Sequence, residues 1–165
     1  MSIEFNADEV FEIAEQIERN GAKFYRKASE NFKDTESKQF LLDLASAEVE
    51  HENTFKKMRA QLAAAEKEST TFDPDEMAGE YLRAMAGGHV FDVTADPSSR
   101  LTGKERLEDI LRQAIGMEKD SIVYYLGMKE ITPEKLGRKH VDAIIKQEMG
   151  HVTLLSRKLA RCKKR

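Results

Sequence analysis

The sequence contains no tryptophan, one cysteine and three prolines, and only 7% of its residues are aromatic. The single cysteine, Cys162, excludes an internal disulfide and a metal cage built from several thiolates of one chain. Few aromatic residues and 35% charged residues favour long solvated helices over a β-sheet. The fold class is therefore predicted to be all-α, and 165 residues suit a single domain, 1–165, with a sizeable core.

A strong charge of one sign and long apolar runs are also missing. The 30 acidic and 27 basic residues give a net charge of -3, so nucleic acid and anionic membranes are not expected as partners. No run approaches the ~18 apolar residues of a membrane span, and the first residues lack the pattern of a secretory signal. We expect a cytoplasmic protein whose basic C-terminal tail complements a helix dipole.

Helix start signals divide the chain into two hairpins. The candidate N-cap residues are polar and precede periodic apolar runs: Asn6, Asp34, Thr102 and Thr132. Four long helices are predicted at these ranges: 7–31, 35–66, 103–129 and 133–160. Short turns within each pair predict antiparallel helix hairpins over about 7–66 and 103–160.

The connection between the hairpins, about 67–102, is long. Asp73-Pro74 is a capped start for a short helix that ends near Gly87. A crossover of this length can travel along the bundle and leave the second and third long helices parallel.

The two hairpins repeat one another at an offset of 100 positions. The identical pairs include Ala14 with Ala114, Glu18 with Glu118, Tyr25 with Tyr125, Glu48 with Glu148, and His51 with His151. This register predicts two hairpins related by a pseudo-two-fold axis.

Six polar residues interrupt the apolar stripes that face the predicted bundle axis: Glu18, Glu48, His51, Glu118, Glu148 and His151. Four buried carboxylates are very unfavourable unless they are compensated, and two divalent cations would balance their charge. Two Glu-x-x-His pairs plus one glutamate from each other helix form the ligand set of bundle-core di-metal sites. An oxygen-rich set of this kind favours iron, with manganese or zinc as substitutes.

Several residues near the predicted ligands have alternative roles. Tyr25 and Tyr125 are either partners that hydrogen-bond a ligand carboxylate or ordinary core aromatics. Gly21 and its counterpart Ser121 either leave room for an oxidant or let two helices approach closely. Solvated or surface positions are expected for Glu15, Glu50, Glu52, Asp120, His89 and His140.

The six-ligand pattern resembles the ferritin-like di-iron carboxylate superfamily, and rubrerythrin-type proteins most of all. The resemblance implies a ferritin-like four-helix bundle and a homodimer. It also implies that Glu18 and Glu118 are terminal ligands and that Glu48 and Glu148 bridge the two irons. His51 and His151 would each cap one iron.

Three departures from the patterns of that superfamily bear on function. The paired Cys-x-x-Cys motifs of a rubredoxin domain are missing, so an electron donor would be a separate protein. Rubrerythrins carry an additional glutamate where this chain has Ser121. The haem-binding methionine of bacterioferritin corresponds to Val49, so no haem is expected.

Three functions follow from these patterns. The first is an oxidoreductase whose di-iron(II) centre reacts with peroxide or dioxygen, with peroxide detoxification as its purpose. The second is a ferroxidase or iron-handling protein for which Fe(II) is the substrate. The third is a bundle that binds metal without catalysis.

Overall fold

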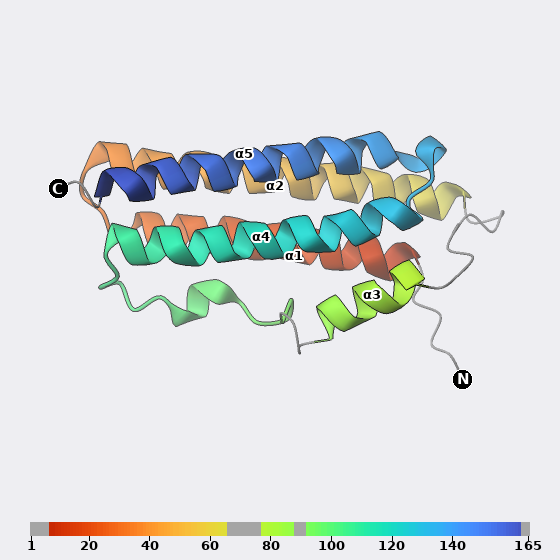
Figure 1. Ribbon diagram of the computed structural model, residues 1–165, viewed down its shortest axis with the longest axis horizontal. Helices are drawn as coiled ribbons and strands as arrows, with labels where there is room; N and C mark the ends of the chain where they lie inside the picture. Colours follow the sequence, from red (N-terminus) through yellow and green to blue (C-terminus); the bar gives the residue numbers. More distant parts are fainter. Residues whose placement is uncertain (1–6, 66–76, 88–91, 163–165) are drawn as a thin grey trace.

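The computed structural model describes residues 7–65, 77–87 and 92–162, and within these ranges every regular element is a helix. Four long helices lie side by side in Figure 1: α1 (Ala7–Ser29), α2 (Thr35–Ala65), α4 (Leu107–Ile131) and α5 (Arg138–Cys162). The pairs α1/α2 and α4/α5 are antiparallel hairpins, whereas α2 and α4 run parallel (Figure 1). The predicted all-α four-helix bundle is confirmed.

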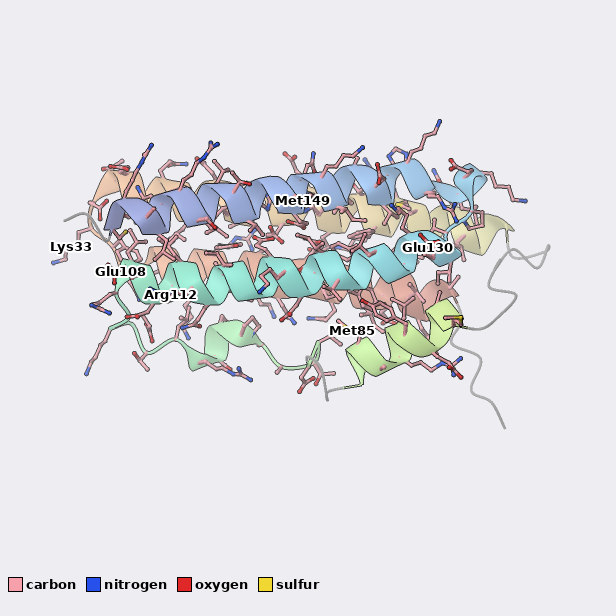
Figure 2. All side chains as sticks on the ribbon, in the orientation of Figure 1. Lys33, Met85, Glu108, Arg112, Glu130 and Met149 are labelled. Atoms are coloured by element: carbon pink, nitrogen blue, oxygen red, sulfur yellow. The ribbon has the colours of Figure 1, made fainter. Side chains whose placement is uncertain are left out.

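The described parts of the crossover lie along the side of the bundle formed by α1 and α4 (Figure 1). It contains a helix, α3 (Met77–Ala86), that packs against α4, and a 3-10 turn, η1 (Pro97–Arg100), that packs against α1. Met85, labelled in Figure 2, is buried in the core from α3. The predicted short helix is therefore present, while its predicted cap at Asp73-Pro74 lies outside the described residues.

The predicted helix start at residue 103 is wrong. Thr102 N donates to Glu105 Oε1 at 2.6 Å, but this bond closes a turn ahead of the helix, where Gly103 has a φ of 83°. The helix α4 begins at Leu107, and Asp109 Oδ2 accepts from the backbone N of Arg106 at 3.3 Å.

The predicted start at residue 133 is also wrong. Thr132 lies at the end of α4, where its Oγ1 donates to the Met128 carbonyl at 2.7 Å. A short 3-10 turn, η2 (Glu134–Leu136), follows, and Gly137 has a φ of 102°, which a helix does not accommodate. The helix α5 therefore begins at Arg138.

The start predicted at Asp34 is confirmed, because its Oδ1 accepts from Ser37 N at 2.8 Å. Asn6 lies outside the described residues. None of the helices in the described residues has the length and apolar character needed to cross a lipid bilayer.

The buried apolar residues form two clusters, and side chains fill the space between the helices (Figure 2). Along α1, Phe11 and Ala14 belong to one cluster, and Phe24 and Tyr25 belong to the other. Glu18 lies between them and is fully buried. A polar layer therefore separates the two apolar clusters near the middle of the bundle.

Candidate metal centre

All six predicted ligand residues meet in this polar layer. Five of them are buried, and the side chain of His151 is only 12% exposed. Their donor atoms form two groups within which all atoms lie within 4.8 Å of one another: Glu18, Glu48, His51 and Glu148, and Glu48, Glu118, Glu148 and His151. Since Glu48 and Glu148 belong to both groups, the arrangement is a pair of four-donor sites that share two carboxylates.

Several donor atoms of the centre make no hydrogen bond to one another, although they lie close enough together to bind a cation. His51 Nδ1 lies 3.0 Å from Glu148 Oε1 and 3.3 Å from Glu18 Oε2. None of these atoms, nor Glu48 Oε1, makes a hydrogen bond of good geometry within the described residues. Unsatisfied buried donors and acceptors are unfavourable, and divalent cations liganded by oxygen and nitrogen would satisfy all of them.

The carboxyl groups of the centre have perturbed acidities. Burial raises the pKa of Glu18 and of Glu48 well above the ordinary value, and the neighbouring carboxylates contribute to the increase. Burial likewise raises the pKa of Glu118 to about 7. In the folded protein without metal, these carboxyl groups therefore keep their protons to a higher pH than solvated glutamates do.

The pKa values of the two imidazoles are raised, although burial alone would lower them. Burial lowers the pKa of His51, but contact with Glu148 outweighs it and raises that pKa to about 9. In His151, burial is outweighed by Glu118 and Glu148, and the pKa rises to about 10. Contact with both imidazoles overcomes the burial of Glu148 and lowers its pKa. A cation that binds here must displace protons from the imidazoles.

The two predicted tyrosines hydrogen-bond ligand carboxylates across the bundle. The hydroxyl of Tyr25 on α1 donates to Glu118 Oε1 on α4, and that of Tyr125 on α4 donates to Glu18 Oε1 on α1. Both phenols are buried. The pair of bonds obeys the pseudo-two-fold relation predicted from the sequence repeat.

The surroundings of the two imidazoles differ. Gln147 Oε1 lies 2.7 Å from His51 Nε2, and because this oxygen only accepts, Nε2 donates and Nδ1 is left for a metal. The position corresponding to Gln147 in the first hairpin is Ala47. Sequence reasoning missed Gln147, and this difference between the halves is the signal that could have identified it.

A cleft of about 440 Å³ reaches the centre between α1 and α4, beneath residues 92–100. Its buried inner end includes Tyr25, Glu48 and Glu118. Asn20 Nδ2 donates to the Val93 carbonyl at 2.9 Å and so holds the crossover beside the cleft. Asn20 was not identified from the sequence, which carries no local signal for a contact across 73 positions.

Gly21 makes room for a carboxylate of the centre. A Cβ atom added at Gly21 would lie 2.9 Å from Glu48 Oε2 and 3.3 Å from Glu48 Cγ. The Glu48 side chain therefore packs against the Gly21 backbone, and Gly21 and Ser121 both line the cleft. Gly21 therefore both leaves space for the Glu48 carboxylate and lines the cleft that reaches the centre.

Two glutamates predicted to be solvated are buried. Glu15 is 6% exposed and Glu52 is 9% exposed. They are held by cations instead, with Arg19 Nη2 at 2.9 Å from Glu52 and Arg59 Nη1 at 3.7 Å from Glu15. Exposed positions are observed as predicted for Glu50, Asp120 and His140, while His89 lies outside the described residues.

Comparisons with known proteins agree with the resemblance inferred from the sequence. A family model described as Rubrerythrin matches residues 9–159. Among solved structures, the chain is similar to a Thermotoga maritima protein described as a ferritin-like diiron-carboxylate protein, with 28% sequence identity and a TM-score of 0.67. That match covers 94% of this chain and 95% of the other. No curated protein matches the sequence.

Proposed function

Because the chain belongs to the rubrerythrin family, we propose that it is an oxidoreductase in which a centre of two iron ions reacts with peroxide or dioxygen. The observation that carries this proposal is the pair of four-donor groups that share Glu48 and Glu148. When bound, two Fe(II) ions supply the two electrons that reduce a peroxide. Peroxide detoxification is the purpose that we propose.

Each residue of the centre has a defined part in this proposal. Glu18 and His51 would hold one iron, and Glu118 and His151 would hold the other. Tyr25 is a positioning residue, because its hydroxyl fixes one oxygen of Glu118. The carboxylates shared between the two groups, Glu48 and Glu148, would keep both metals within reach of one small molecule.

An anaerobic Fe(II) titration tests the proposal. The protein should bind two irons per chain, and one equivalent of hydrogen peroxide per iron pair should convert them to Fe(III), followed by absorption spectroscopy. A Glu148→Gln variant should abolish this response, since Glu148 contributes to both groups. Binding of fewer than two irons by the parent, or an unchanged spectrum after peroxide, would contradict it.

Iron handling is a second candidate, favoured by the acids along the cleft. Asp92 and Asp120 are exposed and line the cleft that leads to Glu48 and Glu118. Exposed carboxylates raise the local concentration of a cation such as Fe(II). Many equivalents of Fe(II) with peroxide distinguish the two functions: a ferroxidase continues to form ferric product, whereas a fixed cofactor saturates at two irons per chain.

A further inference from the structure

The cleft that reaches the centre is much larger than hydrogen peroxide needs. Its volume is about 440 Å³, whereas a water molecule occupies only ~30 Å³ in the liquid. Pockets that bind small organic molecules have volumes of about 300–1,000 Å³. The cleft is therefore large enough for a reactant that carries a carbon group.

The cleft has a buried polar end, apolar walls and an exposed charged rim formed by Asp92, Arg100 and Asp120. Tyr25, Glu48 and Glu118 are almost fully buried, so they form the polar inner end. Ile17, Val93 and Met117 add apolar walls from α1, the crossover and α4. A small molecule with one polar head and a compact apolar body matches the buried polar end and the apolar walls.

The polar inner end lies on the side of the centre away from the imidazoles. Glu48 and Glu118 line the cleft, whereas His51 and His151 are not among its lining residues. A molecule in the cleft would therefore meet the centre beside Gly21 and Ser121, the small residues that α1 and α4 contribute to its lining. Gly21 itself has no side chain to obstruct the approach, and the Glu48 carboxylate packs against it.

We propose that this cleft binds small organic hydroperoxides. The hydroperoxide group would lie at the inner end beside Tyr25 and Glu118, and the carbon group would pack against Ile17, Val93 and Met117. This inference rests on the proposed function, because it names the class of oxidant that the same centre reduces.

The reaction balances with the reactants named. The organic hydroperoxide takes one electron from each of two Fe(II) ions and two protons from solvent. Its O–O bond breaks, one oxygen leaves as an alcohol and the other as water, and two Fe(III) ions result.

Binding is tested first without redox chemistry. Cumyl alcohol, the alcohol produced from cumene hydroperoxide, is titrated into Zn(II)-loaded protein and followed by ligand-observed NMR. The parent should bind it, and Ala95→Phe, which narrows the cleft from the crossover, should weaken binding about tenfold or more. Ala60→Phe adds the same ring at an exposed position on α2 and is the matched control.

Single-turnover oxidation of Fe(II)-loaded protein is the second measurement. The ratio of the rate with cumene hydroperoxide to the rate with hydrogen peroxide should fall about tenfold in Ala95→Phe and should not change in Ala60→Phe. Ile17→Phe, which narrows the cleft from α1, should also lower this ratio of rates. It replaces Ala95→Phe in the test if Ala95→Phe does not fold.

The results separate this inference from the proposed function. A parent protein that reacts with hydrogen peroxide but neither binds cumyl alcohol nor reacts with cumene hydroperoxide overturns the inference alone. Equal binding by Ala95→Phe, Ile17→Phe and Ala60→Phe also overturns it. A parent that binds cumyl alcohol but reacts with neither oxidant overturns the proposed function and supports the cleft as an organic ligand site.

Discussion

The hydroxyl of Tyr25 on α1 donates a hydrogen bond to the Glu118 carboxylate on α4. Tyr125 on α4 donates the reciprocal bond to Glu18 on α1. Each hairpin therefore orients a predicted ligand of the other, although the tyrosine and the glutamate that it contacts are 93 and 107 positions apart in the two cases. The geometry of the candidate metal centre therefore depends on correct pairing of the two hairpins.

Replacing Tyr25 or Tyr125 with phenylalanine should weaken metal binding and leave the fold intact. Loss of a hydrogen bond to a ligand typically reduces metal affinity by about 10–100-fold. The free energy of unfolding of the metal-free protein should fall by only about 1 kcal/mol per bond, because the ring is retained. Competition with a chelator measures the affinity, and circular dichroism measures the stability.

Tyr124→Phe is the matched control for these variants. Tyr124 is equally buried, but its hydroxyl donates to the Val10 carbonyl at 3.1 Å. It should lose similar stability and keep the parent metal affinity. If Tyr25→Phe and Tyr124→Phe bind metal equally well, the tyrosine contact with Glu118 does not orient that ligand.

Single ligand substitutions should differ in how many ions they remove. Glu148 belongs to both donor groups, so Glu148→Gln should lose tight binding of both ions. His51 belongs to one group, so His51→Ala should weaken mainly the ion that Glu18 shares. The exposed neighbour Glu50 provides the control variant Glu50→Gln. Metal content after gel filtration gives the stoichiometry, and two ions retained by Glu148→Gln would contradict the shared arrangement.

The sequence predicted those parts of the structure that have local patterns. The Glu-x-x-His pairs at Glu48 and Glu148 were found because they repeat in register and interrupt apolar stripes. Helix starts near Gly103 and Gly137 were misplaced, because a capping pattern does not reveal that a following glycine adopts positive φ. The hydrogen bond from Asn20 to Val93 depends on how the crossover packs, and no local pattern encodes that contact.

The burial of Glu15 and Glu52 was missed for a related reason. Each is adjacent to the axial stripe rather than on it, and periodicity alone assigns such residues to solvent. Their burial depends on Arg19, Lys56 and Arg59, which reach them from α1 and α2. The structure therefore adds a network of cations that surrounds these carboxylates at the α1/α2 interface.

The metal-free protein should lose stability as the pH rises. The pKa values of His51 and His151 are raised to about 9 and about 10, so their stabilising contribution is complete below the ordinary value of 6.5 and is lost as the pH rises through 9–10. Glu118 acts in the same direction between its ordinary value of 4.5 and about 7. Glu148, with a lowered pKa, loses its contribution only as the pH falls below the ordinary range.

Thermal unfolding in the presence of a chelator measures this effect. The melting temperature should be lower at about pH 10 than at about pH 6, and metal-loaded protein should show less of this decrease because its imidazoles are already deprotonated. His151→Gln should reduce the pH dependence, whereas His140→Gln, at an exposed position, should not. A flat profile for the metal-free parent would show that the imidazoles are not held by these carboxylates.

Gly21→Ala should separate the stability of the helix from the quality of the metal centre. Alanine in place of glycine within a helix stabilises it by about 1 kcal/mol, so the metal-free variant should unfold at the same temperature as the parent or higher. The new Cβ would lie 2.9 Å from Glu48 Oε2, which forces that carboxylate to move. Since Glu48 contributes to both donor groups, the affinity for both ions should fall, by about tenfold or more.

Gly116→Ala is the control for this substitution. A Cβ at Gly116 on α4 meets no atom within 4 Å, so the variant should gain the helix stability and keep the parent metal affinity. Chelator competition and thermal unfolding on the three proteins decide the outcome. If Gly21→Ala binds metal as tightly as Gly116→Ala, the Glu48 carboxylate can ligate from a shifted position, and Gly21 is retained for access through the cleft rather than for the ligand.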